Sequence, residues 1–288
     1  MIYYMKTISS AYSHSDLGKT FDKRRPITEN PEIRSSKPLF VDTYQKLVER
    51  VARISYYNRD WNLFYRGQSI DFKSNDSMTT ILPTLYRVNE NSGKTNIKKL
   101  YENLLNISDG LYEYFRKDGG KKYAGRQLVL KYQELRWAIL QHYKTCDTPL
   151  IDLTHSLHVA CSFALHKNKN ETGVVMLLGL PSIAESISYY PSQELFNIRL
   201  LSFCPPSAKR PFFQEGYVAG PFPIYRLDDS KRRDQFDFAR RLIAKFEIPN
   251  NPKEFFGKDF KIIPEDFLLP KEDKFINELE KIRNKISN

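Results

Sequence analysis

The sequence predicts an α+β fold, with a mixed β-sheet at its core and helices on its flanks. Apolar residues recur at helical spacing through much of the first 165 residues, whereas continuous apolar runs of strand length prevail from residue 173 to about residue 227. The predicted elements therefore follow the order helices, strand, helices and then several strands, which is typical of α+β proteins. Aromatic residues make up 14% of the 288 residues, a content that argues against general disorder.

The first half of the chain contains three segments with the apolar spacing of an amphipathic helix. Between the first two, an aromatic and apolar run ends at Arg66 and Gly67 and predicts a short strand that closes on a turn. A basic, glycine-rich stretch, residues 116–126, is expected to be a surface loop. The predicted helices cover residues 41–54, 97–115 and 127–143, and the predicted strand covers residues 61–65.

The stretch from Leu135 to Leu165 combines apolar segments with polar residues that buried elements rarely carry. Residues 150–153 predict a strand, and residues 157–165 predict an almost wholly apolar helix. Because an unpaired buried polar group costs roughly 1–3 kcal/mol, these polar residues need partners or a ligand. The stretch is therefore predicted to form one wall of a site, with the polar residues His142, Asp152, Thr154, His155 and Ser156.

The second half is expected to supply most of the sheet, beginning with a central strand over the apolar run Gly173 to Leu180. Further strands, a basic helix and a final amphipathic helix follow. The expected strands cover residues 196–204, 211–219 and 221–227, and the expected helices cover residues 232–246 and 271–286. We divide the chain into a polar, basic and loosely docked N-terminal arm (1–37), a central domain (38–228) and a helical C-terminal extension packed on that domain (229–288).

The formal net charge of +11 and the pI of about 9.3 favour a polyanionic partner such as nucleic acid or a nucleotide. A solvated basic surface explains the same excess, and composition alone does not separate the two. The three cysteines lack metal-ligand spacing, so we expect no metal site, reduced thiols and a cytoplasmic protein. No apolar run approaches the roughly 20 residues that span a bilayer, and no signal-peptide pattern is present, so no membrane partner is expected.

Arg66 is the first candidate site residue. It follows Tyr65 at the end of an aromatic strand and precedes Gly67 and Gln68. A glycine lets the backbone approach a ligand closely, and a guanidinium fork suits phosphate or carboxylate in a bidentate pair. The alternative is that Arg66 pairs with a core carboxylate, such as that of Asp152, and pins the fold.

Two further groups of polar residues are candidates. Thr154 or Ser156 is a natural N-cap for the helix that follows, and the N-terminus of a buried helix attracts anions. Capping alone is the alternative explanation for that group. In a regular strand Arg210 and Gln214 would share one face and Glu215 would lie on the other.

Four separated motifs resemble the FRG domain, a prokaryotic and phage-associated family named for an aromatic-Arg-Gly motif. The resemblance spans roughly residues 40–220, and it departs from the family pattern in the loop after His142, at Leu153 and at Leu157. The matching motifs are Phe64-Tyr65-Arg66-Gly67-Gln68, then Leu82-Pro83-Thr84-Leu85-Tyr86-Arg87, then Leu140-Gln141-His142-Tyr143 with Thr148, Asp152, Thr154 and Ser156, and finally Arg210, Gln214, Gly216 and Tyr217.

The order of these motifs is also similar to that of the R-S-E class of ADP-ribosyltransferases, which implies a split sheet and NAD as the cofactor. In that class an Arg grips NAD, a Ser or Thr supports the nicotinamide-ribose pocket, and a Glu stabilises an oxocarbenium-like transition state. The resemblance assigns cofactor binding to Tyr65, Arg66, Gly67, Gln68, Thr154 and Ser156, catalysis to Glu215, Gln214 and His142, and substrate binding to Asp152 and Arg210.

Two functions stay open at this level. The first is an NAD-dependent ADP-ribosyltransferase-like effector of the toxin or phage-defence type, which acts on a nucleic-acid or nucleic-acid-associated target and has a protein partner such as an antitoxin. The second is a non-catalytic nucleic-acid or nucleotide-binding module. Its phosphate contacts would come from Arg66, residues 116–131 and residues 232–241.

Overall fold

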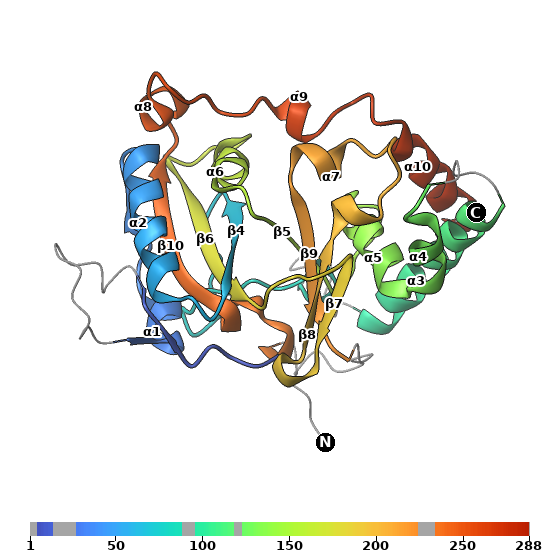
Figure 1. Ribbon diagram of the computed structural model, residues 1–288, viewed down its shortest axis with the longest axis horizontal. Helices are drawn as coiled ribbons and strands as arrows, with labels where there is room; N and C mark the ends of the chain where they lie inside the picture. Colours follow the sequence, from blue (N-terminus) through green and yellow to red (C-terminus); the bar gives the residue numbers. More distant parts are fainter. Residues whose placement is uncertain (1–4, 14–26, 88–95, 118–122, 224–233, 288) are drawn as a thin grey trace.

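The computed structural model describes residues 5–13, 27–87, 96–117, 123–223 and 234–287. At its centre lies an eight-stranded mixed sheet with the strand order β3-β10-β6-β4-β5-β9-β8-β7 (Figure 1). Neighbouring strands are antiparallel, except that β3 and β10 are parallel. This sheet and its flanking helices confirm the predicted α+β fold. The strands are β3 (Leu39–Phe40), β10 (Leu242–Pro249), β6 (Thr172–Leu180), β4 (Asn62–Gln68), β5 (Ile151–Thr154), β9 (Gly216–Pro221), β8 (Leu195–Arg199) and β7 (Ile187–Tyr190).

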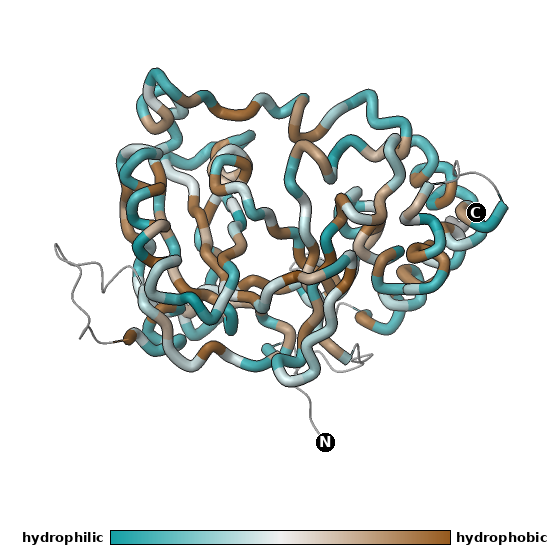
Figure 2. The backbone as a smooth tube through the Cα atoms, viewed as in Figure 1, coloured by the Kyte–Doolittle hydropathy of each residue, from teal (hydrophilic) through white to brown (hydrophobic). Residues whose placement is uncertain are grey.

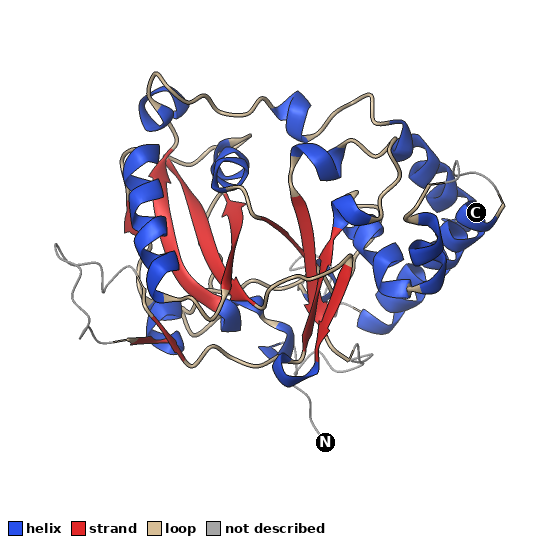
Figure 3. Cartoon of the chain, in the orientation of Figure 1, coloured by secondary structure: helices blue, strands red, loops and turns tan. Residues whose placement is uncertain are grey.

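The sheet is divided between β4 and β5. These two strands pair at a single position, Tyr65 opposite Thr154, whereas β4 pairs with β6 along its whole length from Asn62 to Gln68. The strands of the two halves therefore diverge on either side of one contact, as Figure 3 shows. Backbone groups that face this opening lack a strand partner, so side chains must supply their hydrogen bonds.

Helices surround both halves of the sheet (Figure 1). Helix α6 is central to the site because it packs on β4 and β6, and its N-cap Ser156 accepts a hydrogen bond from the Val159 N–H. Helices α3, α4, α5 and α10 gather at one end of the molecule. The helices are α1 (Asn30–Ser35), α2 (Tyr44–Tyr57), α3 (Ile97–Arg116), α4 (Arg126–Lys131), α5 (Gln133–His142), α6 (Leu157–Leu165), α7 (Arg210–Phe213), α8 (Pro252–Phe256), α9 (Glu265–Leu268) and α10 (Lys274–Ser287).

Buried apolar side chains form two clusters. One joins β10, β6 and β4 to α2 and α6, and the other joins β8 and β9 to α3, α5 and α10. Figure 2 shows the hydrophobic segments running along the strands and the inward faces of the helices. Cys161 and Cys204 are buried and Cys146 is partly buried, and none of the three forms a disulfide. The first cluster also contains Ile151, Leu153, Leu195 and Ala219 of β5, β8 and β9, so it spans the division of the sheet.

Several predicted elements differ from the structure. The helix expected over residues 127–143 is two helices, α4 and α5, which meet at the extended residue Tyr132. The strand expected over residues 211–219 begins instead as the helical turn α7, because Pro211 occupies the first turn, where its fixed φ favours a helix. The strand expected over 196–204 ends at Arg199, and most of the one expected over 221–227 lies outside the described residues.

The basic helix expected over residues 232–246 is the largest error. Residues 238–241 form a 3-10 turn and residues 242–249 form strand β10, which pairs with both β3 and β6. The positive charges favour an exposed helix, but Arg241 and Lys245 are both buried. The Lys245 ammonium donates to Asp71 (2.9 Å) and Thr79 (2.6 Å), so its charge is satisfied inside the protein. The uninterrupted burial from Leu242 to Phe246 is that of a central strand.

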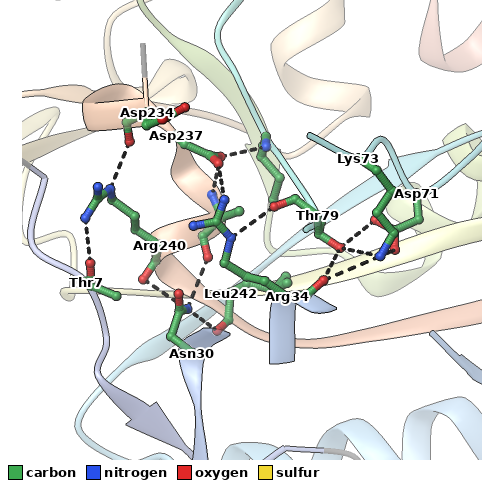
Figure 4. A network of polar contacts seen from close by, with 12 residues as sticks. Thr7, Asn30, Arg34, Asp71, Lys73, Thr79, Asp234, Asp237, Arg240 and Leu242 are labelled. Atoms are coloured by element: carbon green, nitrogen blue, oxygen red, sulfur yellow. Dashed lines mark hydrogen bonds and ion pairs between the residues drawn. The ribbon is translucent and has the colours of Figure 1, made fainter. Parts of the chain in front are cut away.

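The described parts of the N-terminal arm are packed on the core, not loosely docked. Strands β1 (Ser10–Ala11) and β2 (Thr28–Glu29) pair with each other. Asn30 donates to the carbonyl of Ala239 (3.2 Å), and Arg34 forms a 2.6 Å ion pair with Asp237 (Figure 4). The consecutive basic residues of the arm, Lys23, Arg24 and Arg25, lie outside the described residues. Apolar side chains of the arm complete the core, namely Met5, Ile8, Ala11 and Ile33.

Candidate functional site

A cavity of about 170 Å³ lies where β4 and β5 diverge, and we call it the split-sheet cavity. It is enclosed by residues from β4, β5, α5 and α6, together with two residues from late in the chain. Its polar lining consists of Tyr65, Arg66, His142, Lys144, Asp152, Thr154 and Gln214. Its remaining lining consists of Gly67, Leu153, Ala160, Phe163 and Leu269.

Arg66 bridges the opening between the two halves of the sheet. Its Nη1 donates to the main-chain carbonyl of Asp152 (2.7 Å), and its Nε donates to Oε1 of Gln68 (3.1 Å). The guanidinium thus satisfies a β5 carbonyl that has no partner from β4. Burial of the guanidinium and repulsion from Arg87 lower the pKa of Arg66 to about 10, although Asp152 opposes that shift. Arg66 stays charged at neutral pH and places a cation in the cavity.

Asp152 is the carboxylate of the split-sheet cavity. Its Oδ2 accepts a hydrogen bond from Nε2 of Gln141 (2.7 Å), and its Oδ1 lies 3.0 Å from Nδ1 of His142. Burial acts to raise the pKa of Asp152, but the hydrogen bonds from His142 and Gln141 and the charge of Arg66 outweigh burial and lower it. Asp152 is therefore ionised at neutral pH.

The amide of Gln141 has a defined orientation. The Thr148 hydroxyl accepts from the Leu150 N–H (3.2 Å) and contacts Oε1 of Gln141, to which it donates. This contact leaves the NH2 group of Gln141 for Asp152. Neither Gln141 nor Thr148 was among the predicted site residues, although both belong to the motifs of the family resemblance, and Gln141 directly precedes His142 in the sequence.

His142 presents an unpaired ring nitrogen. An ionised carboxylate only accepts hydrogen bonds, so Nδ1 of His142 must carry the proton that binds Asp152. The opposite nitrogen, Nε2, is buried and has no hydrogen-bond partner among the described residues. Gly216 makes room for the ring, because a Cβ at that position would lie 2.9 Å from Cε1 of His142. Asp152 thus fixes the orientation of the ring through Nδ1, and Nε2 is left without a hydrogen-bond partner among the described residues.

Gly67 has a different role from the expected one. A Cβ at this position would lie 1.9 Å from the carbonyl oxygen of Ala160, so the glycine is required for the close packing of α6 on β4. Ser156 caps α6 and does not line the split-sheet cavity. Thr154 lines the cavity, and its hydroxyl accepts from the Ser156 N–H (3.0 Å). Capping and turn formation thus account for much of this group.

The late motif contributes one of its three candidates to the cavity. Gln214 is buried, lines the cavity and donates from Nε2 to the carbonyl of Leu268 (2.7 Å). Glu215 is exposed, has a positive φ of 44° and lies outside the lining. Arg210 also lies outside, with its guanidinium 5.1 Å from the ring centroid of Tyr143. Arg66, Ser156 and Glu215 therefore do not line one cavity.

Several of the described basic residues expected to contact phosphates have partners within the protein, and residues 118–122 and 232–233 lie outside the described residues. Arg241 is buried and lies 4.3 Å from the centroid of the Trp61 ring. Arg116 pairs with Glu113 (2.7 Å), and Arg126 donates to a main-chain carbonyl of α3. Among the described residues, no cluster of three or more His, Cys, Asp or Glu could hold a metal ion, and no helix has the length and apolarity needed to cross a membrane.

Comparison with known proteins identifies part of the chain. Residues 61–173 match the family model of the FRG domain. No curated protein and no solved structure matches the sequence or the fold. The matched range contains Arg66, Gln141, His142, Thr148 and Asp152, which are the residues of the hydrogen-bonded site described above. The chain thus contains an FRG domain over residues 61–173.

Proposed function

We propose that this protein is an ADP-ribosyltransferase-type enzyme that consumes NAD, with the split-sheet cavity as the active site. The observation that carries the proposal is that three groups belong to residues that line one cavity. These groups are the ionised carboxylate of Asp152, the guanidinium of Arg66 and the unpaired Nε2 of His142. A fixed anion, a fixed cation and a free base form an arrangement suited to transfer of a glycosyl group.

Each of the three groups has a specific role in this proposal. Transfer breaks the bond between the ribose and nicotinamide and forms a bond to an acceptor, so positive charge develops on the ribose. Asp152 supplies a negative charge to face it. Arg66 holds an anionic part of the substrate, and His142 accepts the acceptor's proton at Nε2. These assignments replace Glu215 with Asp152 as the carboxylate, because Asp152 lines the cavity and Glu215 does not.

The volume of the cavity fits one end of NAD. A cavity of about 150 Å³ holds benzene, so 170 Å³ takes one aromatic ring and little more. Pockets for whole cofactors are roughly 300–1,000 Å³. Tyr65 and Phe163 offer aromatic surface for such a ring. The cavity is thus suited to nicotinamide, and the rest of the dinucleotide would extend beyond it.

The proposed acceptor is a nucleic acid or a protein bound to one. The net charge of +11 attracts polyanions, and a transferase with a nucleic-acid target would act as an effector of the toxin or phage-defence type. A protein antitoxin and a cytoplasmic site of action belong to the same proposal. The binding-module alternative has less support, since Arg66, Arg116, Arg126 and Arg241 all have partners within the protein.

The proposal is tested with NAD labelled in its adenylate half. The purified full chain is incubated with the label and with single-stranded DNA, RNA or a cell lysate, and both nicotinamide release and label transfer are measured. Arg66→Lys is expected to lower turnover at least 100-fold, because an ammonium cannot bridge Gln68 and the Asp152 carbonyl as the fork does. The matched control is Arg59→Lys, at an exposed position outside the cavity.

Paired carboxylate variants test which acid is catalytic. Asp152→Asn is expected to abolish turnover, while Glu215→Gln is expected to leave it within about twofold, because Glu215 is exposed outside the cavity. The reverse pattern would show that the cavity assignment is wrong. Absence of nicotinamide release with every acceptor, together with salt-sensitive nucleic-acid binding, would refute the enzyme and favour the binding module.

A further inference from the structure

A second pocket flanks the β4–β5 junction, with a volume of about 380 Å³. Thr154 lines the split-sheet cavity, and the next residue, His155, lines the second pocket. In the same way Gly216 lies against His142, whereas Tyr217 lines the second pocket. The two linings have no residue in common, so the second pocket is separate from the proposed active site.

His155 gives this pocket an unsatisfied polar group. Its ring packs against those of Phe64 and Tyr217, with centroid distances of 4.1 Å and 4.3 Å, and these two rings also contact each other. Burial, with repulsion from Arg199, lowers the pKa of His155, so the imidazole is neutral at pH 7. Its Nε2 is buried and has no hydrogen-bond partner among the described residues. Such a group is costly unless a ligand or water satisfies it.

Two side chains of opposite charge line the second pocket and are free to bind a ligand. Arg199 and Glu185 line it and are exposed. Within the described parts of the chain, neither side chain forms an ion pair or a hydrogen bond, with each other or with any other group. A guanidinium fork is suited to a phosphate, and a carboxylate accepts hydrogen bonds from vicinal hydroxyls. The partly buried ring of Tyr217 offers a surface on which a flat base can stack.

We propose that the second pocket binds a nucleoside monophosphate unit, through the base on Tyr217, the ribose at Glu185 and the phosphate at Arg199. The volume of about 380 Å³ lies at the lower end of the range for small-molecule sites, which suits one nucleotide and not a dinucleotide. A free nucleotide and one unit of a single-stranded nucleic acid share this chemistry. The inference does not depend on the proposed transferase activity.

Titration calorimetry of the full chain tests this site. The probes are 5′-AMP, adenosine, inorganic phosphate, and short single-stranded RNA and DNA. We expect 5′-AMP to bind at least tenfold more tightly than adenosine or phosphate, and Arg199→Ala to weaken it at least tenfold. Because Arg199 is exposed, this substitution should leave folding intact. Arg59→Ala, at an exposed position outside both pockets, is the matched control for a lost surface charge.

The remaining arms distinguish the source of the ligand. Glu185→Gln is expected to weaken the binding of 5′-AMP more than the binding of its 2′-deoxy analogue. In the unmodified protein, ligand binding should also shift the Nε2 resonance of His155. If oligonucleotides bind to the native protein but not to Arg199→Ala, and free 5′-AMP does not bind, the ligand is one nucleotide unit of a nucleic-acid strand. That outcome would support the proposal. Failure of every probe to bind at millimolar concentration, or equal weakening by Arg59→Ala, would overturn it.

Discussion

Asp152→Asn is the most informative single substitution, because it preserves shape while reversing one hydrogen bond. Thr148 directs the NH2 group of Gln141 toward residue 152, so an asparagine there must turn its own oxygen toward Gln141. Its NH2 group would then face Nδ1 of His142, which can accept that bond only without its own proton. We therefore expect the imidazole proton to move to Nε2, which converts the free base into a donor.

The expected losses can be worked out from the same contacts. Two charge-assisted hydrogen bonds, at 2.7 Å and 3.0 Å, become neutral ones. Each change lowers the free energy of unfolding by up to about 1 kcal/mol. The side chain of Asp152 is 31% exposed, so a total near 1 kcal/mol is expected, or about 2–4 °C in Tm. Turnover should fall far more, by roughly 10³–10⁴, as in enzymes whose catalytic histidine is held in the wrong tautomer.

The pH dependence of stability gives an independent check of the Asp152 charge. The folded pKa of Asp152 is lowered from 3.8, so its stabilising contribution is present above about pH 4 and is lost as pH falls through the folded pKa. The difference in unfolding free energy between the native protein and Asp152→Asn should therefore shrink in acid. A difference that grew as pH fell from 5 to 3 would contradict the sign of this shift.

The decisive assay identifies the tautomer of His142 by long-range ¹H–¹⁵N correlation NMR on histidine-labelled protein. The chain has 5 histidines, and His142→Gln identifies the signal of interest. The native protein should show the Nδ1–H form of His142, and Asp152→Asn should show the Nε2–H form. Asp147→Asn, at an exposed residue nearby, is the matched control. Retention of the Nδ1–H form in Asp152→Asn would refute the reasoning, whatever happened to turnover.

Three further perturbations test the framework of the site. Gly67→Ala places a Cβ 1.9 Å from the carbonyl oxygen of Ala160 and should lower the unfolding free energy by roughly 3 kcal/mol or more, measured by urea denaturation. Asp273→Ala removes the acceptor of the Tyr143 hydroxyl and of two main-chain N–H groups of the 209–210 turn, and should cost a similar amount. Burial lowers the pKa of Lys245 to about 8, so the unfolded chain binds more protons between pH 8 and 10.5. The native protein should therefore gain stability relative to Lys245→Met as pH rises through that interval, and a loss would contradict burial as the cause.

Much of the site could be predicted because its residues lie at the ends of regular elements. Arg66 lies near the end of an aromatic strand, and Asp152 lies in a short apolar one. His142 continues the buried face of its helix, which the 3.6-residue period predicts from the sequence. Motifs of this kind keep their relation to the core even when element boundaries shift by a few residues.

Features that depend on distant partners could not be predicted in the same way. The alternation rule applied to residues 210–217 assumes a regular strand, but the helical turn from Arg210 and the positive φ of Glu215 break the alternation. Lys245 appears from the sequence as one charge of a basic helix. Its burial depends on Asp71 and Thr79, which lie more than 160 residues earlier, and no local pattern indicates that pairing.

The family match ends at residue 173, but the split-sheet cavity does not. Gln214 and Leu269 line it, and the carbonyl of Leu268 holds the Gln214 amide in place. Strand β10 pairs with β3 and β6 and so completes the half of the sheet that carries Arg66. The matched range thus supplies the charges and the base, while later segments enclose them. A chain that ended at residue 173 would lack β10 and the wall at Gln214, which is why the hydrogen-bonded site alone cannot form the enclosed cavity that the proposed chemistry needs.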